Sequence, residues 1–226
     1  MTPTDPSTSN SSSIPQGNQT SDDQLKWSEA GGDNPYNVKI LDIRDFTQNA
    51  VATQYNQPVV ESFNESRSDN GEKYKTALIA NAQTYKANIV YQHKGQGAIY
   101  KAESMEVKWD IYAYDNWLYF VKSWTSELVY KAHFIKKNDK LVIDKIITGA
   151  VEKMSSTDEE KETYAAQNVY SMIQTHLMDT AWPYKIPEMM RDIPEKLIAS
   201  HMFALFGSKA TVATHANVLN IKFSEK

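Results

Sequence analysis

The stretch that decides the fold is WDIYAYDNWLYFVKSW, residues 109–124. Aromatic and β-branched residues fill both sides of Asp115-Asn116, a polar dipeptide suited to a two-residue hairpin turn. The sequence therefore predicts an antiparallel β-hairpin whose register is set by that turn. In this register four aromatic residues share one face, with Tyr114 opposite Trp117 and Tyr112 opposite Tyr119.

Similar sequence extends outward from the hairpin, from Tyr85 to Thr148, and is interrupted by short polar turns. It predicts a meander of antiparallel strands. If a turn at Thr125-Ser126 follows the hairpin, the aromatic face continues onto the next strand. That face then adds Val121, Leu128, Tyr130, Ala132 and Phe134, while the opposite face holds Trp109, Ile111, Ala113, Leu118, Phe120, Lys122, Trp124, Lys131 and His133.

Both faces of the predicted sheet are more apolar than a solvated face should be. We therefore expect each face to be covered. Two explanations stay open at this point. The chain can close a two-sided core by itself, or one face can be covered by a partner protein or by a second copy of the chain, since Trp and Tyr are enriched in interfaces.

Helices are predicted after the meander. The pattern Thr157-x-x-Glu160 is a capping box and predicts a helix over about residues 158–178. Asp192 and Pro194 predict the start of a second helix, which ends at Gly207. The other predicted elements are a short strand within residues 37–46, a helical turn at 59–63, a helix at 73–82 and a last strand at 218–223.

The predicted fold class is α+β, an antiparallel β-meander with the C-terminal helices packed mainly on one face. Residues 1–34 are rich in Ser, Thr and Asn and predict a disordered acidic tail, followed by a single domain over residues 35–226. The tail holds five acidic residues and one basic residue, so it accounts for the whole net charge of −4. The rest of the chain is neutral, and we do not expect it to bind nucleic acid.

The sequence contains no apolar run of the roughly 18–20 residues that a membrane-spanning helix needs, so no membrane span is predicted. The N-terminus also lacks the basic start and apolar stretch of a signal peptide. We therefore predict a cytoplasmic protein. The alternative is a periplasmic or surface-tethered protein in which the tail is the stalk left by a processed precursor.

The chain has no Cys, which excludes disulfides, thiolate metal sites and cysteine nucleophiles. None of the five histidines has the spacing of a metal-binding motif, and no phosphate-binding or nucleophile-elbow motif occurs. No metal site and no cofactor are predicted. One pair is of interest: a two-residue turn at Asn138-Asp139 places His133 opposite Asp144, and a carboxylate can orient an imidazole as a general base.

The leading functional hypothesis is a non-enzymatic protein-binding module, such as an inhibitor, immunity-type or adaptor protein, that binds a protein partner or itself through its aromatic sheet surface. The first alternative is a hydrolase that uses His133, Asp144 and water. The second is a tethered surface or structural protein. The residues predicted to form the binding surface are Trp109, Tyr112, Tyr114, Trp117, Tyr119 and Trp124.

Overall fold

The structure is a computed structural model that describes residues 25–44, 46, 57–92, 95–151 and 157–222. Most of the predicted tail, residues 1–24, lies outside the described residues. The short strand β1 (Trp27–Ser28) follows and pairs with β2 (Ile40–Asp42). Residues 27–28 therefore belong to the same sheet as residues 40–42.

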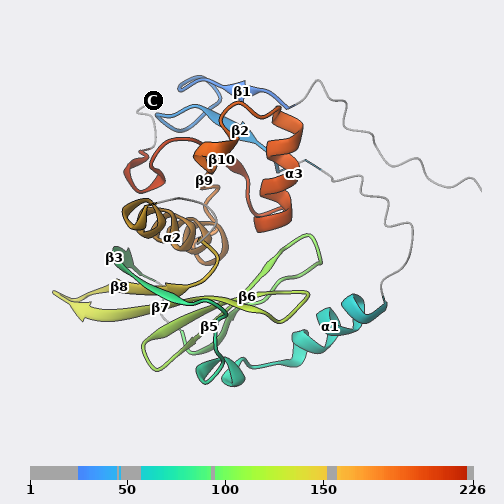
Figure 1. Cartoon of the computed structure of the whole chain (residues 1–226), viewed down its shortest axis with the longest axis vertical. Helices are drawn as coiled ribbons and strands as arrows, with labels where there is room; N and C mark the ends of the chain where they lie inside the picture. Colours follow the sequence, from blue (N-terminus) through green and yellow to red (C-terminus); the bar gives the residue numbers. More distant parts are fainter. Residues whose placement is uncertain (1–24, 45, 47–56, 93–94, 152–156, 223–226) are drawn as a thin grey trace, which may run out of the picture.

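The main element is a six-stranded antiparallel sheet with the strand order β3-β8-β7-β6-β5-β4 (Figure 1). The predicted α+β class is confirmed. The four central strands form a meander, but β3 leaves the expected order and pairs with β8 instead of β4. The strands are β3 (Gln83–Tyr91), β4 (Gly97–Tyr100), β5 (Trp109–Tyr114), β6 (Trp117–Lys122), β7 (Leu128–Lys137) and β8 (Lys140–Thr148).

The predicted hairpin is formed by β5 and β6. Its register is as expected, with Tyr114 opposite Trp117 and Tyr112 opposite Tyr119. The turn residues Asp115 and Asn116 have φ values of 49° and 64°. Two consecutive positive φ values are what a tight hairpin turn requires, and Asp and Asn adopt them at low cost.

The predicted continuation of the aromatic face onto β7 is wrong. Val121 pairs with Leu128 and Phe120 pairs with Tyr130, so Val129 is an extra residue, a β-bulge. The bulge reverses the faces of β7. Tyr130, Ala132 and Phe134 therefore lie in the core with Trp109 and Phe120, whereas Lys131 and His133 lie on the face of Tyr119 and Trp117.

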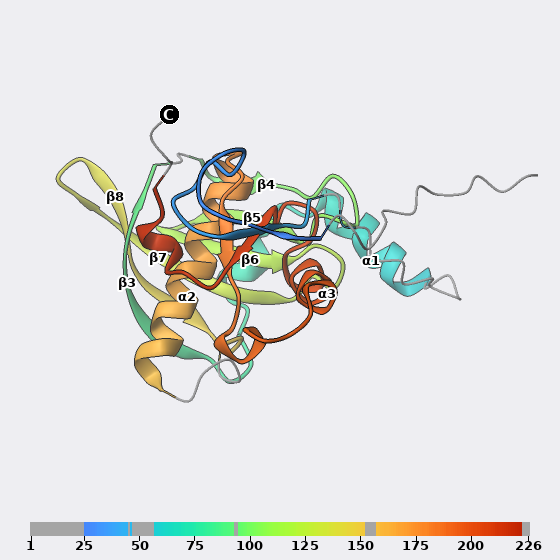
Figure 2. The ribbon, with the colours of Figure 1, turned by 90° about the horizontal axis from the view of Figure 1, so that it is seen from above.

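The inner face of this sheet is covered by the C-terminal helices, as predicted. These are α2 (Asp158–Met172), continued by a π-helical turn over Ile173–Leu177, and α3 (Glu195–Phe206). Figure 2 shows both helices over the sheet from above. The Thr157 hydroxyl caps α2 by accepting from the Glu160 N–H, and Gly207 ends α3 at a φ of 75°. No helix of the described residues has the length and apolarity to cross a membrane.

A second, four-stranded sheet lies on the far side of α2 from the six-stranded sheet (Figure 1). It joins the N-terminal strands to β9 (Pro183–Lys185) and β10 (Val212–Thr214) in the order β1-β2-β10-β9. The last strand predicted at residues 218–223 is wrong over its described part, because Val218–Asn220 form a 3-10 turn. Val218 and Ile221 are buried in a small cluster with Tyr36 and Trp182, which explains their apolar pattern.

The outer face of the six-stranded sheet is covered over β5 and over the part of β6 that follows Trp117. Helix α1 (Gln57–Ser68) and the 3-10 turn Glu72–Lys75 lie there. The helix predicted at residues 73–82 is wrong beyond this turn, because the chain enters β3 at Gln83. Tyr74 from the turn packs against Tyr112, with ring centroids 5.2 Å apart. Gly71 allows this approach, since a Cβ there would overlap the Tyr112 ring.

Candidate functional site

The six aromatic residues predicted to form a binding surface fall into two groups. Trp109, Tyr112 and Tyr119 are buried, with at most 2% of each exposed. Tyr112 and Tyr119 belong to the outer cluster under the 3-10 turn, and Trp109 belongs to the inner core. Burial raises the pKa of the Tyr112 hydroxyl far above its usual value. These three rings hold the sheet to the elements that cover it.

The other three predicted residues are partly exposed, and two of them are held by neighbouring elements. The Tyr114 hydroxyl donates a hydrogen bond of 2.7 Å to the Asn70 carbonyl. The Trp124 ring lies 3.8 Å from the Lys108 ammonium, measured to the ring centroid. Trp117 remains as the aromatic ring that faces the uncovered part of the sheet.

The surroundings of Trp117 are cationic. The ammonium groups of Lys131 on β7 and Lys145 on β8 both lie 5.4 Å from its ring centroid. The His133 ring is 4.9 Å away, centroid to centroid. We call these residues, together with Asp144, the Trp117 face.

Two β-bulges bring the Trp117 face together. The bulge at Val129 turns Lys131 and His133 toward Trp117. In the second bulge, His133 pairs with Lys145 and Phe134 pairs with Ile143, so Asp144 is the extra residue. The lysines of two neighbouring strands therefore flank one tryptophan.

His133 and Asp144 are in contact, as the sequence suggested, although the bulge shifts their register by one residue. The His133 Nδ1 and Asp144 Oδ1 atoms are 2.7 Å apart, and both side chains are partly exposed. A carboxylate on Nδ1 fixes the proton there and leaves Nε2 as the basic atom. No hydroxyl of the described residues forms a hydrogen bond with this imidazole. The pair thus has the orientation of a general base without an attached nucleophile.

The Trp117 face carries more positive than negative charge. Asp144 is its one carboxylate and it is bonded to His133. Within the described ranges, neither Lys131 nor Lys145 forms an ion pair with a carboxylate. The two ammonium groups are therefore available to an anionic group of another molecule. In the part of the chain that the structure describes, no cluster of three metal-binding side chains occurs.

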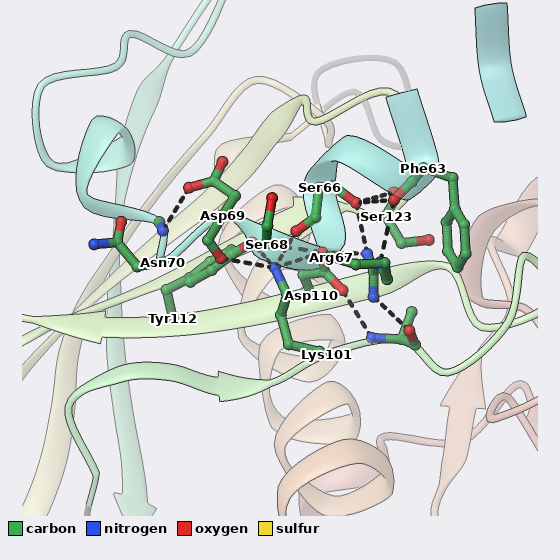
Figure 3. A network of polar contacts seen from close by, with 12 residues as sticks. Phe63, Ser66, Arg67, Ser68, Asp69, Asn70, Lys101, Asp110, Tyr112 and Ser123 are labelled. Atoms are coloured by element: carbon green, nitrogen blue, oxygen red, sulfur yellow. Dashed lines mark hydrogen bonds and ion pairs between the residues drawn. The ribbon is translucent and has the colours of Figure 1, made fainter. Parts of the chain in front are cut away.

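A second cluster of polar side chains lies between the outer face of the sheet and α1 (Figure 3). The Asp110 carboxylate on β5 is 1% exposed and lies 2.7 Å from the Arg67 guanidinium of α1. Its other oxygen accepts from the Ala102 N–H at 2.8 Å. The Lys101 ammonium lies 3.6 Å from Asp110 and donates to the Tyr112 hydroxyl at 2.7 Å.

The partners in this cluster satisfy one another. Burial lowers the pKa of Lys101, and the neighbouring Asp110 opposes that shift. Lys101 also donates to the Ser66 and Asp69 carbonyls at the end of α1, and Arg67 donates to the Ala102 carbonyl. We conclude that the cluster anchors α1 to β5 and to residues 101–102 after β4, which is a structural role.

The residues that sequence reasoning missed are the lysines of the Trp117 face. The alternating pattern predicts Lys131 on the opposite face from Trp117, whereas the structure places it on the same face, and no sequence motif marks Lys145. The alternation of Lys131 and His133 on one strand was visible, but the face on which they lie depends on a bulge that no local motif marks.

Comparisons with known proteins add no function. No family model matches the chain, and neither a curated protein nor a solved structure matches it.

Proposed function

We propose that this chain is a non-enzymatic protein-binding module, and that its Trp117 face binds an acidic segment of a partner protein. The observation that carries the proposal is the position of Trp117 between two lysines without carboxylate partners among the described residues. An acidic segment would pair with Lys131 and Lys145 and would lay apolar atoms against the indole ring.

Two physical arguments support this choice. Tryptophan is over-represented among the residues whose truncation costs most binding energy, because its large rigid ring loses little entropy on binding. Complementary charge raises the association rate and excludes like-charged partners. Lys131 and Lys145 should therefore make the affinity depend on salt, while Trp117 should set most of the dissociation rate.

The test is quantitative affinity capture from the native host with the full chain and three variants. Trp117→Ala and Lys145→Glu should each capture at least tenfold less of the same specific partner. Lys75→Glu should capture as much of it as the unchanged chain. Lys75 is a matched control, because it is an outer-face lysine that lies beside Tyr114 and is paired with Asp115. The captured protein is then titrated as a purified partner at low and high salt.

The proposal fails if folded Trp117→Ala captures the same proteins in the same amounts as the unchanged chain. It also fails if the purified partner binds equally well to the Lys145→Glu variant. If the captured protein is the chain itself, sedimentation at rising concentration reports self-association through the same face.

The 2.7 Å contact between His133 and Asp144 favours one second candidate, a hydrolase that activates water at His133 Nε2. Hydrolysis of a panel of activated esters by the purified chain would be lost in His133→Gln and in Asp144→Asn. Hydrolysis by both variants at the same rate as the unchanged chain would exclude this function.

A further inference from the structure

A separate cavity of about 220 Å³ lies at the end of β5, β6 and β7, between the sheet and the helices α2 and α3. It does not include the Trp117 face. Four of its ten lining residues are aromatic, and the polar side chains of Lys122, Glu127 and Asn168 also line it. The residues used below are Trp109, Lys122, Tyr130, Tyr164, Asn168 and Phe206, and we call the space they line the Lys122 cavity.

One wall of the Lys122 cavity carries an amine with spare donors. The Lys122 ammonium donates to the Leu205 carbonyl at the end of α3, at 2.6 Å, and lies 4.0 Å from the Trp109 ring centroid. An ammonium group has three N–H donors. Within the described ranges, Lys122 forms no further hydrogen bond and no ion pair with a carboxylate. This partly buried cation forms no ion pair among the described residues, although Glu127 lines the same cavity.

The α2 wall carries polar atoms of its own. Tyr164 is 6% and Asn168 is 2% exposed, yet the Tyr164 hydroxyl and the Asn168 side-chain oxygen have no partner at hydrogen-bond geometry among the described residues. Burial raises the pKa of Tyr164, and the neighbouring Asn168 side chain opposes that shift. The Asn168 side-chain nitrogen donates to the Tyr130 hydroxyl at 3.2 Å. Buried polar atoms are nearly always paired in folded proteins, so two unpaired atoms on side chains that line one cavity favour a group that is supplied from outside.

We propose that the Lys122 cavity binds a small aromatic carboxylate that carries a hydroxyl group. The carboxylate would pair with Lys122, the ring would lie among Trp109 and Phe206, and the hydroxyl would bond to Tyr164 and Asn168. The volume suits a single-ring molecule, because an apolar cavity of about 150 Å³ already holds benzene. Each orphaned atom and the unpaired ammonium then gains a partner.

The ionisation of Lys122 supports this assignment. The pKa of Lys122 is lowered to about 7, mainly by burial. Glu127 opposes this shift, and the neighbouring Lys108 adds to it. Glu127 is exposed in the turn before β7, and Lys108 is bonded to the Met105 carbonyl. The other groups that face the amine are the Trp109 ring, the Leu205 carbonyl and the uncharged side chains of Tyr130, Tyr164 and Asn168. A bound carboxylate would favour the protonated amine, so the ligand should bind more tightly at pH 6 than at pH 8.

The experiment is calorimetric titration of the full chain with 4-hydroxybenzoate. We expect saturable binding that is about tenfold weaker at pH 8 than at pH 6, since only about a tenth of Lys122 is protonated at pH 8. At pH 8 the binding should take up a proton, which two buffers of different ionisation enthalpy reveal. The neutral analogue 4-hydroxybenzyl alcohol should bind at least tenfold more weakly than the carboxylate at pH 6.

Two variants test the residues. Lys122→Met should weaken binding at least tenfold at pH 6. Lys75→Met is its matched control, because Lys75 lies outside both the Lys122 cavity and the Trp117 face and also contacts an aromatic ring. Because Lys122 also holds the end of α3, Tyr164→Phe serves as a second variant that removes only a hydroxyl, and it should weaken binding about fivefold. The proposal is overturned if 4-hydroxybenzoate at concentrations up to 10 mM does not saturate the chain at pH 6. This upper concentration is about 100 times a dissociation constant of about 0.1 mM. Affinity unchanged in the folded variants would overturn it as well.

Discussion

Replacing the buried Asp110 by Ala should destabilise the protein more than any surface change, because it removes the carboxylate that holds two cations. Arg67 Nη2 lies 2.7 Å from Asp110, and the two side chains are 25% and 1% exposed. Removing one partner of a buried ion pair typically costs about 3–5 kcal/mol, since the other charge stays buried without compensation. We expect a loss in that range for Asp110→Ala.

The reverse change, Arg67→Ala, should cost less, about 2–3 kcal/mol. Lys101 remains 3.6 Å from Asp110 and can take over part of its charge. The Asp110 carboxylate that stays behind is 1% exposed, but it also keeps its hydrogen bond from the Ala102 N–H at 2.8 Å. In the double variant the two losses should overlap, with a coupling energy of about 2 kcal/mol between the two side chains.

The assay is urea unfolding at 25 °C, followed by tryptophan fluorescence, on the unchanged chain, both single variants and the double variant. The pair Arg44 and Asp42 is a matched control, because its atoms are also 2.7 Å apart while its side chains are 53% and 43% exposed. Its coupling should be below about 1 kcal/mol. The reasoning is refuted if the buried pair couples no more strongly than the exposed one, or if Asp110→Ala costs less than about 1 kcal/mol.

Three further changes have expected outcomes. Gly71→Ala should cost about 2–4 kcal/mol in urea unfolding, because φ is +85° there and a Cβ overlaps Tyr112, whereas Gly31→Ala meets only the backbone strain at φ +96° and should cost about 1 kcal/mol. Burial lowers the pKa of His176 from 6.5 to about 3. Between these two pH values the imidazole is protonated in the unfolded chain but not in the folded chain, so the free energy of unfolding falls as the pH drops from 6.5 to 3. His176→Gln should flatten that fall by about 1 kcal/mol per pH unit, and an unchanged slope would contradict the assignment. Thr157→Ala removes the cap of α2 and should cost about 1 kcal/mol of unfolding free energy, with no effect on 4-hydroxybenzoate binding.

The elements that could be predicted from sequence are those with local signals. Asp115 and Asn116 set the hairpin because their own backbone conformations make the turn. Thr157 starts α2 and Gly207 ends α3 through contacts within a few residues of each helix end. In these cases the residues that carry the signal are also the residues that adopt the structure.

The elements that could not be predicted depend on distant partners. The strand β3 pairs with β8 across the whole meander, and no residue near Tyr85 marks that choice. In VLNIKF the apolar residues at positions 219, 221 and 223 alternate as in a strand, but the residues that fill the cluster against Trp182 are Val218 and Ile221, which are three positions apart. Hydrophobic pattern alone does not separate these two causes.

The candidate site likewise has one part that a local signal predicts and another part that depends on distant residues. Contact between His133 and Asp144 followed from one tight turn. Their neighbourhood did not, because Trp117 and His133 share a face only after the extra residue Val129 has shifted the register. A one-residue shift moves every following side chain to the other face, so an alternating pattern cannot reveal it.

The four-stranded sheet makes the order of synthesis matter. Leu41 of β2 pairs with Ala213 of β10, and Asn37 exchanges two hydrogen bonds with Lys222. As the chain emerges from the ribosome, β2 must wait until residues 212–222 have been synthesised before it finds these neighbours. A nascent chain that stops short of β10 therefore presents Leu41, which is fully buried in the fold, to chaperones and proteases until β10 has been made.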